Sequence, residues 1–194
     1  MQNPYLTRES RLLYAKSFHD LAAPLGALTL CLDDIKKALP ESAEIVEASV
    51  ETLSNKIRYW RLMLTGGDES PAYAEAINVI KEMAKLKNVN VMFASGGEYQ
   101  GMYVRLILAL AMVCIESLPR GGEIIINPEE GVVKATSQKC YVPKEFQNAI
   151  LQVADQPSSR HVLGMLIVDL ARCCGCVLKL SSDPTELLFT LNKA

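Results

Sequence analysis

Apolar residues recur at alternating intervals of three and four along the first 65 residues. The two runs are Phe18, Leu21, Leu25, Leu28, Leu32, Ile35 and Leu39, and then Ala43, Val46, Val50, Leu53, Ile57, Trp60 and Leu64. This heptad spacing predicts two long helices that each carry one apolar stripe. We expect a tight turn at residues 40–42, where Pro40 interrupts the pattern, and an end at Gly66 and Gly67. Two long helices with a short connection form an antiparallel hairpin.

A hairpin alone cannot bury these two stripes. Thirteen of the fourteen stripe positions are larger than alanine, and leaving them half exposed would cost on the order of 10 kcal/mol. A second copy is the simplest cover, because two hairpins form a four-helix bundle. The C-terminal half of the same chain is the alternative cover. We therefore expect a homodimer.

The pattern changes after residue 67, and short strands alternate with helices. We expect helices over residues 71–87, 101–118, 143–153 and from 160 to about 174, with strands over 89–94, 123–127, 132–139, 177–181 and 186–191. Ser70 is the expected N-cap of the first of these helices. The order predicts an α/β sandwich with helices on one face of a mixed sheet. The expected organisation is an α+β chain, with a helical hairpin over residues 1–67 and this sandwich over residues 68–194.

Composition excludes several function classes. Hydrophobic residues make up 49% and charged residues 22% of the chain, and 20 Lys and Arg face 22 Asp and Glu. A net charge of −2 without a basic cluster disfavours nucleic-acid binding. The apolar stretches are too short to span a bilayer, and the first residues carry no export signal, so we expect a cytoplasmic protein without membrane contact. Cys173, Cys174 and Cys176 are too crowded for the usual spacing of metal ligands, and we expect them to pack as small apolar residues.

Chemistry is expected at one of the two histidines. His161 opens a helix with apolar neighbours, where capping or packing is the usual role. His19 occupies a position beside the apolar stripe, where we expect it to face solvent. Pro24 follows inside the same helix, removes the hydrogen bond to the carbonyl of Asp20 and bends the helix. A proline inside a helix costs about 3 kcal/mol, which points to a functional reason for keeping it.

The segment FHDLAAPL, residues 18–25, resembles the phospho-acceptor box of sensor histidine kinases, Phe-Ser/Thr-His-Glu/Asp-Leu-x-x-Pro-Leu. The resemblance extends through the LPRGG turn at residues 118–122 to the last helix and strands, which are similar to a kinase ATP-binding (Bergerat) domain. The nucleotide motifs are missing, however. Residues 106–113 contain no Asn as a magnesium ligand, residues 132–142 no Asp-x-Gly-x-Gly, and residues 143–159 no glycine, so that only Gly164 remains of the second glycine box.

A degenerate ATP-binding domain on a phospho-acceptor hairpin resembles the ChpT-type histidine phosphotransferases over residues 10–194. The resemblance implies a kinase-like dimeric four-helix bundle followed by a degenerate HATPase-like α/β sandwich. It also implies a function in a bacterial cell-cycle phosphorelay. Such proteins pass a phosphoryl group from the receiver aspartate of a hybrid histidine kinase to receiver aspartates of response regulators.

The resemblance also implies roles for individual residues. His19 would be the nucleophile and phospho-acceptor, and Asp20 would orient its ring. Lys16 would contact the phosphoryl oxygens or serve as an ordinary surface lysine. The chain itself would hold no cofactor and no metal, since Mg²⁺ would come from the receiver. Ala23 stands where phosphatase-competent kinases carry Thr or Asn, so little hydrolysis is expected. Two alternatives are an active ATP-dependent histidine kinase and a non-catalytic dimer that docks receiver domains.

Overall fold

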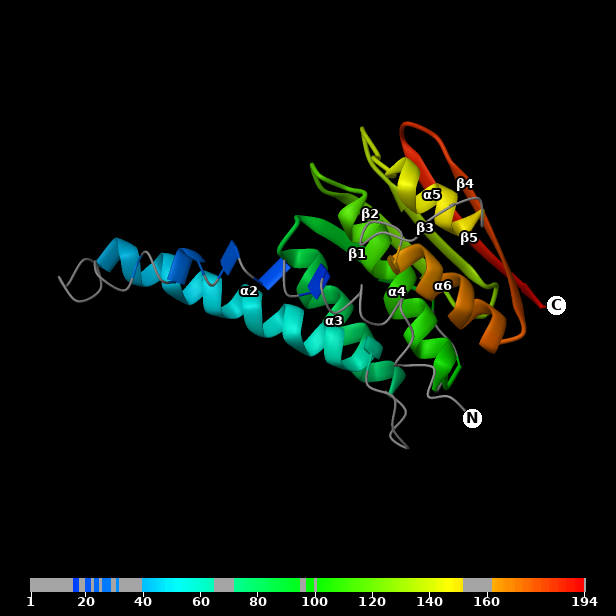
Figure 1. Ribbon diagram of the computed structural model, residues 1–194, viewed down its shortest axis with the longest axis horizontal. Coiled ribbons are helices and arrows are strands. Elements are labelled where there is room, and N and C mark those ends of the chain that lie inside the picture. The colour runs from blue at the N-terminus through cyan, green and yellow to red at the C-terminus, as the bar shows by residue number, and fades with distance from the viewer. Residues whose placement is uncertain are drawn as a thin grey trace.

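The computed structural model describes residues 16, 17, 20, 21, 23, 24, 26–28, 31, 40–64, 72–94, 97–99, 101–151 and 162–193. These residues form a long helix, α2 (Pro40–Leu64), and an α/β body, with short helical pieces of the preceding segment beside α2 (Figure 1). The described residues between 16 and 31 are all helical, as the first apolar run predicts. Most of that run lies outside the described residues, however.

The predicted turn between the two helices is wrong in its position. Pro40 is the first residue of α2, and Glu41 and Ser42 are helical rather than part of a turn. Proline is well tolerated at the first helical position, because its missing N–H would have had no partner there and its backbone angle already suits a helix. The proline therefore starts the second helix.

The body is built on one mixed five-stranded sheet, with strand order β1-β2-β3-β5-β4. Strands β1 and β2 pair in parallel, and the other neighbours pair antiparallel. The sheet is therefore mixed, as the sequence predicts. The strands are β1 (Val89–Phe93), β2 (Gly122–Asn127), β3 (Val132–Thr136), β4 (Cys176–Ser182) and β5 (Glu186–Lys193). The helices of the body are α3 (Tyr73–Lys85), α4 (Met102–Glu116), α5 (Lys144–Ile150) and α6 (Val162–Cys173). Helix α4 connects β1 to β2, which is the usual crossover between parallel strands.

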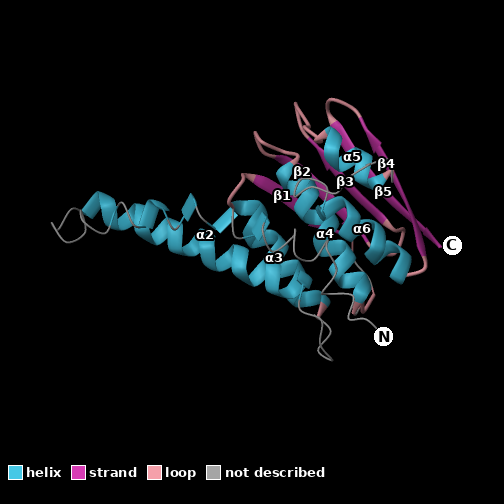
Figure 2. Cartoon of the chain, viewed as in Figure 1, coloured by secondary structure: helices cyan, strands magenta, loops and turns pink. Residues whose placement is uncertain are grey.

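The helices cover one face of this sheet (Figure 2). Ile124 and Ile126 of β2 are buried beneath them, whereas Ile125 between them is exposed on the other face. Such alternation is expected because successive side chains of a strand point to opposite faces. Helix α4 lies in the centre of the core, and every residue from Val104 to Ile115 is buried. The sheet and α4 therefore form a complete core within one chain.

Two details of the body refine the sequence prediction. Ala72, and not Ser70, is the N-cap of α3, and it makes no side-chain capping bond. The glycine pair of the LPRGG turn is required by a close backbone approach, since a Cβ at Gly121 would lie 2.5 Å from the carbonyl oxygen of Asn88. Gly121 also has a positive φ of 78°, which favours glycine. This turn is therefore explained by packing between the starts of β1 and β2.

The C-terminal end of α2 packs on the body, against α3 and α4. Tyr59, Trp60 and Met63 are buried there, while the N-terminal half of the helix projects beyond the body (Figure 1). The alternative cover considered for the apolar stripe, the chain's own C-terminal half, therefore applies to this end of α2. None of the described helices is long and apolar enough to cross a membrane.

The cysteines near the C-terminus only partly follow the expectation that all three pack as apolar residues. Cys174 and Cys176 pack against the hydrophobic core. Cys173 is exposed at the end of α6, which corrects the expectation for that residue. All six cysteines are described, and all six are free thiols.

Candidate functional site

The predicted acceptor segment is described on both sides of its histidine. Lys16 and Ser17 precede the histidine, Asp20 and Leu21 follow it, and all four are helical. His19 itself lies outside the described residues, as do Phe18 and His161. The site is therefore described through the groups around the predicted acceptor. Among these groups, Lys16 and Asp20 are the two that the sequence predicts.

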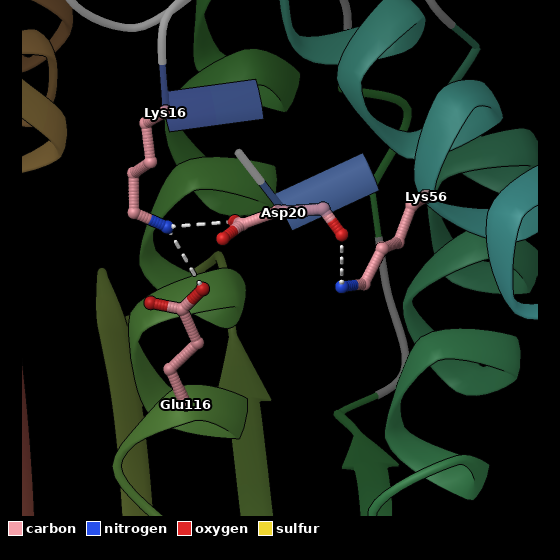
Figure 3. A network of polar contacts seen from close by, with 4 residues as sticks. All are labelled: Lys16, Asp20, Lys56 and Glu116. Carbon is pink, nitrogen blue, oxygen red and sulfur yellow. Dashed lines mark hydrogen bonds and ion pairs between the residues drawn. The ribbon is translucent and has the colours of Figure 1, made fainter. Parts of the chain in front are cut away.

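Lys16 forms two ion pairs, which Figure 3 shows, and one cation–π contact. Its Nζ lies 3.1 Å from Oδ2 of Asp20, four residues later, and 3.2 Å from Oε1 of Glu116 at the end of α4. The same ammonium lies 5.7 Å from the ring centroid of Trp60 on α2, within the range of a cation–π contact. One lysine thus ties the acceptor segment to the body and to α2.

Electrostatics favour the charged form of Lys16. Burial by itself would lower its pKa, but the carboxylates of Glu116 and Asp20 together raise the pKa above the ordinary value for lysine. The side chain of Lys16 is 22% exposed, so these pairs are only partly screened by solvent. Lys16 therefore carries a positive charge beside the predicted acceptor position. Contact of Lys16 with phosphoryl oxygens and orientation of the His19 ring by Asp20 stay predictions.

A second lysine reaches the acceptor segment from the opposite side. Lys56 of α2 donates from Nζ to the main-chain carbonyl oxygen of Asp20 over 3.2 Å. Figure 3 shows Lys16 and Glu116 on one side of Asp20 and Lys56 on the other. The carboxylate and the carbonyl of Asp20 are thus held by different elements.

A cleft of about 460 Å³ opens next to this network, between α4, α5 and the start of α6. Its walls include Lys16, Val113, Glu116, Glu145, Phe146 and Leu163. Two carboxylates and one ammonium give the described lining an excess of negative charge, which disfavours a highly anionic ligand. Glu116 belongs both to the cleft and to the Lys16 network. The ion pair between Lys16 and Glu116 therefore lies in the wall of the cleft.

The described lining of the cleft contains no glycine. Phosphates are usually held by exposed backbone N–H groups in glycine-rich turns at a helix start. Gly164 is the remaining glycine of such a box, but it is buried in a helix contact, and a Cβ there would lie 2.8 Å from Cβ of Ala149. Its lack of a side chain is explained by the close packing of α6 on α5.

Sequence reasoning did not identify Glu116 and Lys56 as parts of the site. Glu116 is the acidic last residue of a helix whose other residues are almost all apolar. Lys56 lies between the stripe residues Leu53 and Ile57. A charge at the end of an apolar helix and a lysine between apolar positions were the available signals. Neither indicates its partner, because Glu116 lies 100 residues from Lys16 and Lys56 lies 36 from Asp20.

Comparison with solved structures shows the fold. A bacterial phosphotransferase shares 19% sequence identity with this chain and superposes with a TM-score of 0.84, covering 96% of this chain and 98% of its own. The histidine kinase AdeS of Acinetobacter baumannii shares 11% identity, with 89% and 95% of the two chains covered and a TM-score of 0.48. The likeness to the kinase is too distant to carry an argument. The first likeness confirms the predicted α+β fold.

Comparison of sequences gives the family. No curated protein matches this chain at a significant level. The family described as "Histidine phosphotransferase C-terminal domain" matches residues 73–186, from the start of α3 to the first residue of β5. This match covers more than half of the chain and almost all of the α/β body. The chain therefore belongs to the histidine phosphotransferase family.

Proposed function

We propose that this chain is a phosphorelay intermediate that carries phosphoryl groups between receiver aspartates on His19. The observation that carries the proposal is the clamp on Asp20, the residue directly after His19. Asp20 is joined through Lys16 to Glu116 of a histidine phosphotransferase C-terminal domain. The segment that resembles a histidine acceptor box thus contacts the domain that matches a histidine phosphotransferase family.

The transfer needs few groups from this chain. A neutral nitrogen of the His19 ring attacks the phosphorus of a receiver's aspartyl phosphate in line. The N–P bond forms as the bond from phosphorus to the aspartyl oxygen breaks, and the aspartate leaves as a carboxylate. The reverse step on a second receiver breaks the N–P bond and returns the free imidazole. Because the two phosphorylated species are similar in energy, positioning contributes more than acid–base strength.

The proposal assigns the metal ion to the partner and gives ATP no part in the reaction of this chain. Mg²⁺ comes from the acidic pocket of the receiver, and ATP is not used by this chain. The excess of carboxylates in the described lining of the cleft and the packing role of Gly164 support this assignment. Ala23 is exposed and carries no polar side-chain atom that could position a water molecule, which supports slow hydrolysis of the receiver phosphate.

The proposed partners are those of a bacterial phosphorelay. They are the receiver domain of a hybrid histidine kinase, the receivers of response regulators and, in a homodimer, a second copy of this chain. The apolar residues Ile45, Val50 and Ile57, which remain about half exposed on α2, support the dimer. We place this relay in the cytoplasm and in cell-cycle control.

The test is incubation of the protein with a receiver domain that carries a ³²P-labelled aspartyl phosphate. We expect the wild-type chain to take up label that is lost in acid and kept in alkali, which is typical of phosphohistidine. His19→Ala should abolish this uptake, and His161→Ala, which removes the other histidine, should leave it unchanged. Incubation with γ-³²P-labelled Mg-ATP alone should give no label.

Three outcomes would contradict the proposal. Label in the His19→Ala variant would move the acceptor elsewhere. Label from ATP alone would favour the kinase alternative. Binding of the receiver by the wild-type chain without any uptake of label would favour the docking dimer.

A further inference from the structure

Pro24 leaves one main-chain acceptor without its helical donor. Residues 20, 21, 23 and 24 are helical, so the carbonyl of Asp20 would normally accept a hydrogen bond from the N–H of residue 24. Proline has no N–H, and its ring also pushes against that carbonyl. A half-buried carbonyl without a donor destabilises the folded state. The carbonyl of Asp20 is therefore a place where a donor from another element would stabilise the segment.

Lys56 supplies that donor. Its Nζ lies 3.2 Å from the carbonyl oxygen of Asp20, in a contact that is partly buried. The donor is charged, and a hydrogen bond from a charged donor is in general stronger than a neutral one. Among the described residues, no carboxylate forms an ion pair with Lys56. The ammonium is thus directed to the main chain of the acceptor segment rather than to a neighbouring acid.

Lys16 and Lys56 contact different groups of Asp20. Lys16 pairs with the side chain of Asp20, from the same segment and together with Glu116 of α4. Lys56 bonds to its main chain from α2. Of these two contacts, the one from Lys56 lies on the carbonyl whose usual helical donor is absent at Pro24. The contribution of this Lys56 hydrogen bond should therefore depend on Pro24.

We propose that Lys56 is a positioning residue for phosphotransfer, which fixes the main chain directly after His19 by donating to the carbonyl of Asp20, whose usual helical donor is absent at Pro24. The inference rests on the proposed function of His19. A proline inside a helix weakens the hydrogen bonding of the preceding turn, and the bond from Lys56 holds the main chain of that turn in place. In-line transfer depends on placement at the scale of about 1 Å, so a mobile turn slows the step without touching the ring itself.

A double-mutant cycle tests this pairing. Lys56→Met keeps the aliphatic stem and removes the donor, whereas Pro24→Ala restores an N–H that can bond to the carbonyl of Asp20. We expect Lys56→Met alone to lower the transfer rate at saturating receiver about tenfold or more, with the half-saturating receiver concentration unchanged. Lys56→Arg, which keeps a charged donor, should retain most of the rate. In the Pro24→Ala background, Lys56→Met should change the rate by no more than about twofold.

The four proteins of the cycle are wild type, Lys56→Met, Pro24→Ala and the double variant. They are also compared by denaturant unfolding, which needs no phosphotransfer. Lys56→Met should shift the unfolding midpoint to lower denaturant in the wild-type background and have little effect in the Pro24→Ala background. This coupling survives even if label transfer shows that His19 is not the acceptor, so the two proposals fail separately. An equal loss of rate in both backgrounds would overturn the inference, because Lys56 would then act on the phosphoryl group or the receiver. An unchanged rate in Lys56→Met would overturn it as well.

Discussion

Helices α2 and α4 pack against each other but differ in how much of their apolar surface this chain covers. Every residue of α4 from Val104 to Ile115 is buried. On α2 only Tyr59, Trp60 and Met63 are buried, all near its C-terminal end. Ile45, Val50 and Ile57 remain 51%, 46% and 49% exposed. The α/β body therefore completes its own core, whereas α2 keeps apolar side chains exposed that the described part of the chain does not cover.

The difference separates two kinds of stability. Removal of a group from the core around α4 acts within one chain, and its cost appears in the free energy of unfolding. In the proposed homodimer, a change on the exposed stripe of α2 acts on association, and its cost appears in the oligomeric state. Contacts at the C-terminal end of α2 join the two regions. The predictions below concern the exposed stripe of α2, its contact with α4, and the ion pairs of Lys16.

The largest effect is expected on the exposed stripe of α2. Val50→Glu combined with Ile57→Glu places two carboxylates in the proposed dimer interface, where burying them without partners costs several kcal/mol. We expect the molar mass in multi-angle light scattering to fall from that of a dimer to that of a monomer. Met92→Glu is the matched control, because Met92 is a comparably exposed apolar residue on β1 in the body.

The double variant should fold as the wild type does. We expect its circular dichroism spectrum to be preserved, since both side chains are exposed in the single chain. A dimer that persists in the double variant would show that this stripe is not the interface. Dissociation caused by Met92→Glu would move the interface to the open face of the sheet.

The next effect is expected where α2 meets α4. The hydroxyl of Tyr59 donates to the carbonyl oxygen of Leu108 over 2.5 Å, and Tyr59 is completely buried. Tyr59→Phe removes this bond but keeps the ring, so the free energy of unfolding should fall by about 1–1.5 kcal/mol in urea. Tyr141→Phe is the control and should change it by less than about 0.5 kcal/mol, because Tyr141 is 61% exposed. Equal stability of Tyr59→Phe and wild type would mean that this bond does not join the two regions.

The fold of the body was accessible from the sequence because its signals are local. Apolar runs between glycine and proline turns predicted all five strands and all four helices of the body, with errors of a few residues at their ends. Pro40 was misplaced because proline both ends helices and starts them, and the sequence does not say which. The N-cap of α3 was misplaced for a similar reason, since a serine near a helix start need not be the cap.

The site was predictable only in part, because its contacts are distant in sequence. Lys16 and Asp20 could be named from their spacing to His19, and their pairing follows from their positions four residues apart on a helix. Glu116 reaches them because α4 ends beside the acceptor segment, and Lys56 reaches the carbonyl of Asp20 from α2. Such contacts depend on the packing of α2, α4 and the acceptor segment, which no local pattern specifies.

The smallest effect is expected at Lys16, whose ion pairs connect the acceptor segment to α4. The pairs are partly exposed, so Lys16→Met should lower the free energy of unfolding by only about 0.2–1 kcal/mol at pH 7. Asp20 and Glu116 together raise the pKa of Lys16 in the folded protein, against the opposing effect of burial. A raised folded-state pKa means that the stabilisation is complete below the ordinary lysine pKa of about 10.4 and is lost as the pH rises through the raised value.

The measurement is the difference in unfolding free energy between wild type and Lys16→Met, followed in urea from pH 7 to about pH 11.5. This difference should stay constant up to about pH 10 and then shrink, as the lysine of the wild type loses its proton. Tyrosines with raised pKa values also titrate at alkaline pH, but both proteins contain them, so their effect cancels in the difference. Lys87→Met, at an exposed lysine after α3, should show no difference at any pH. A difference for Lys16→Met that persists unchanged at pH 11.5 would mean that the aliphatic stem, packed near Trp60, stabilises the contact rather than the charge.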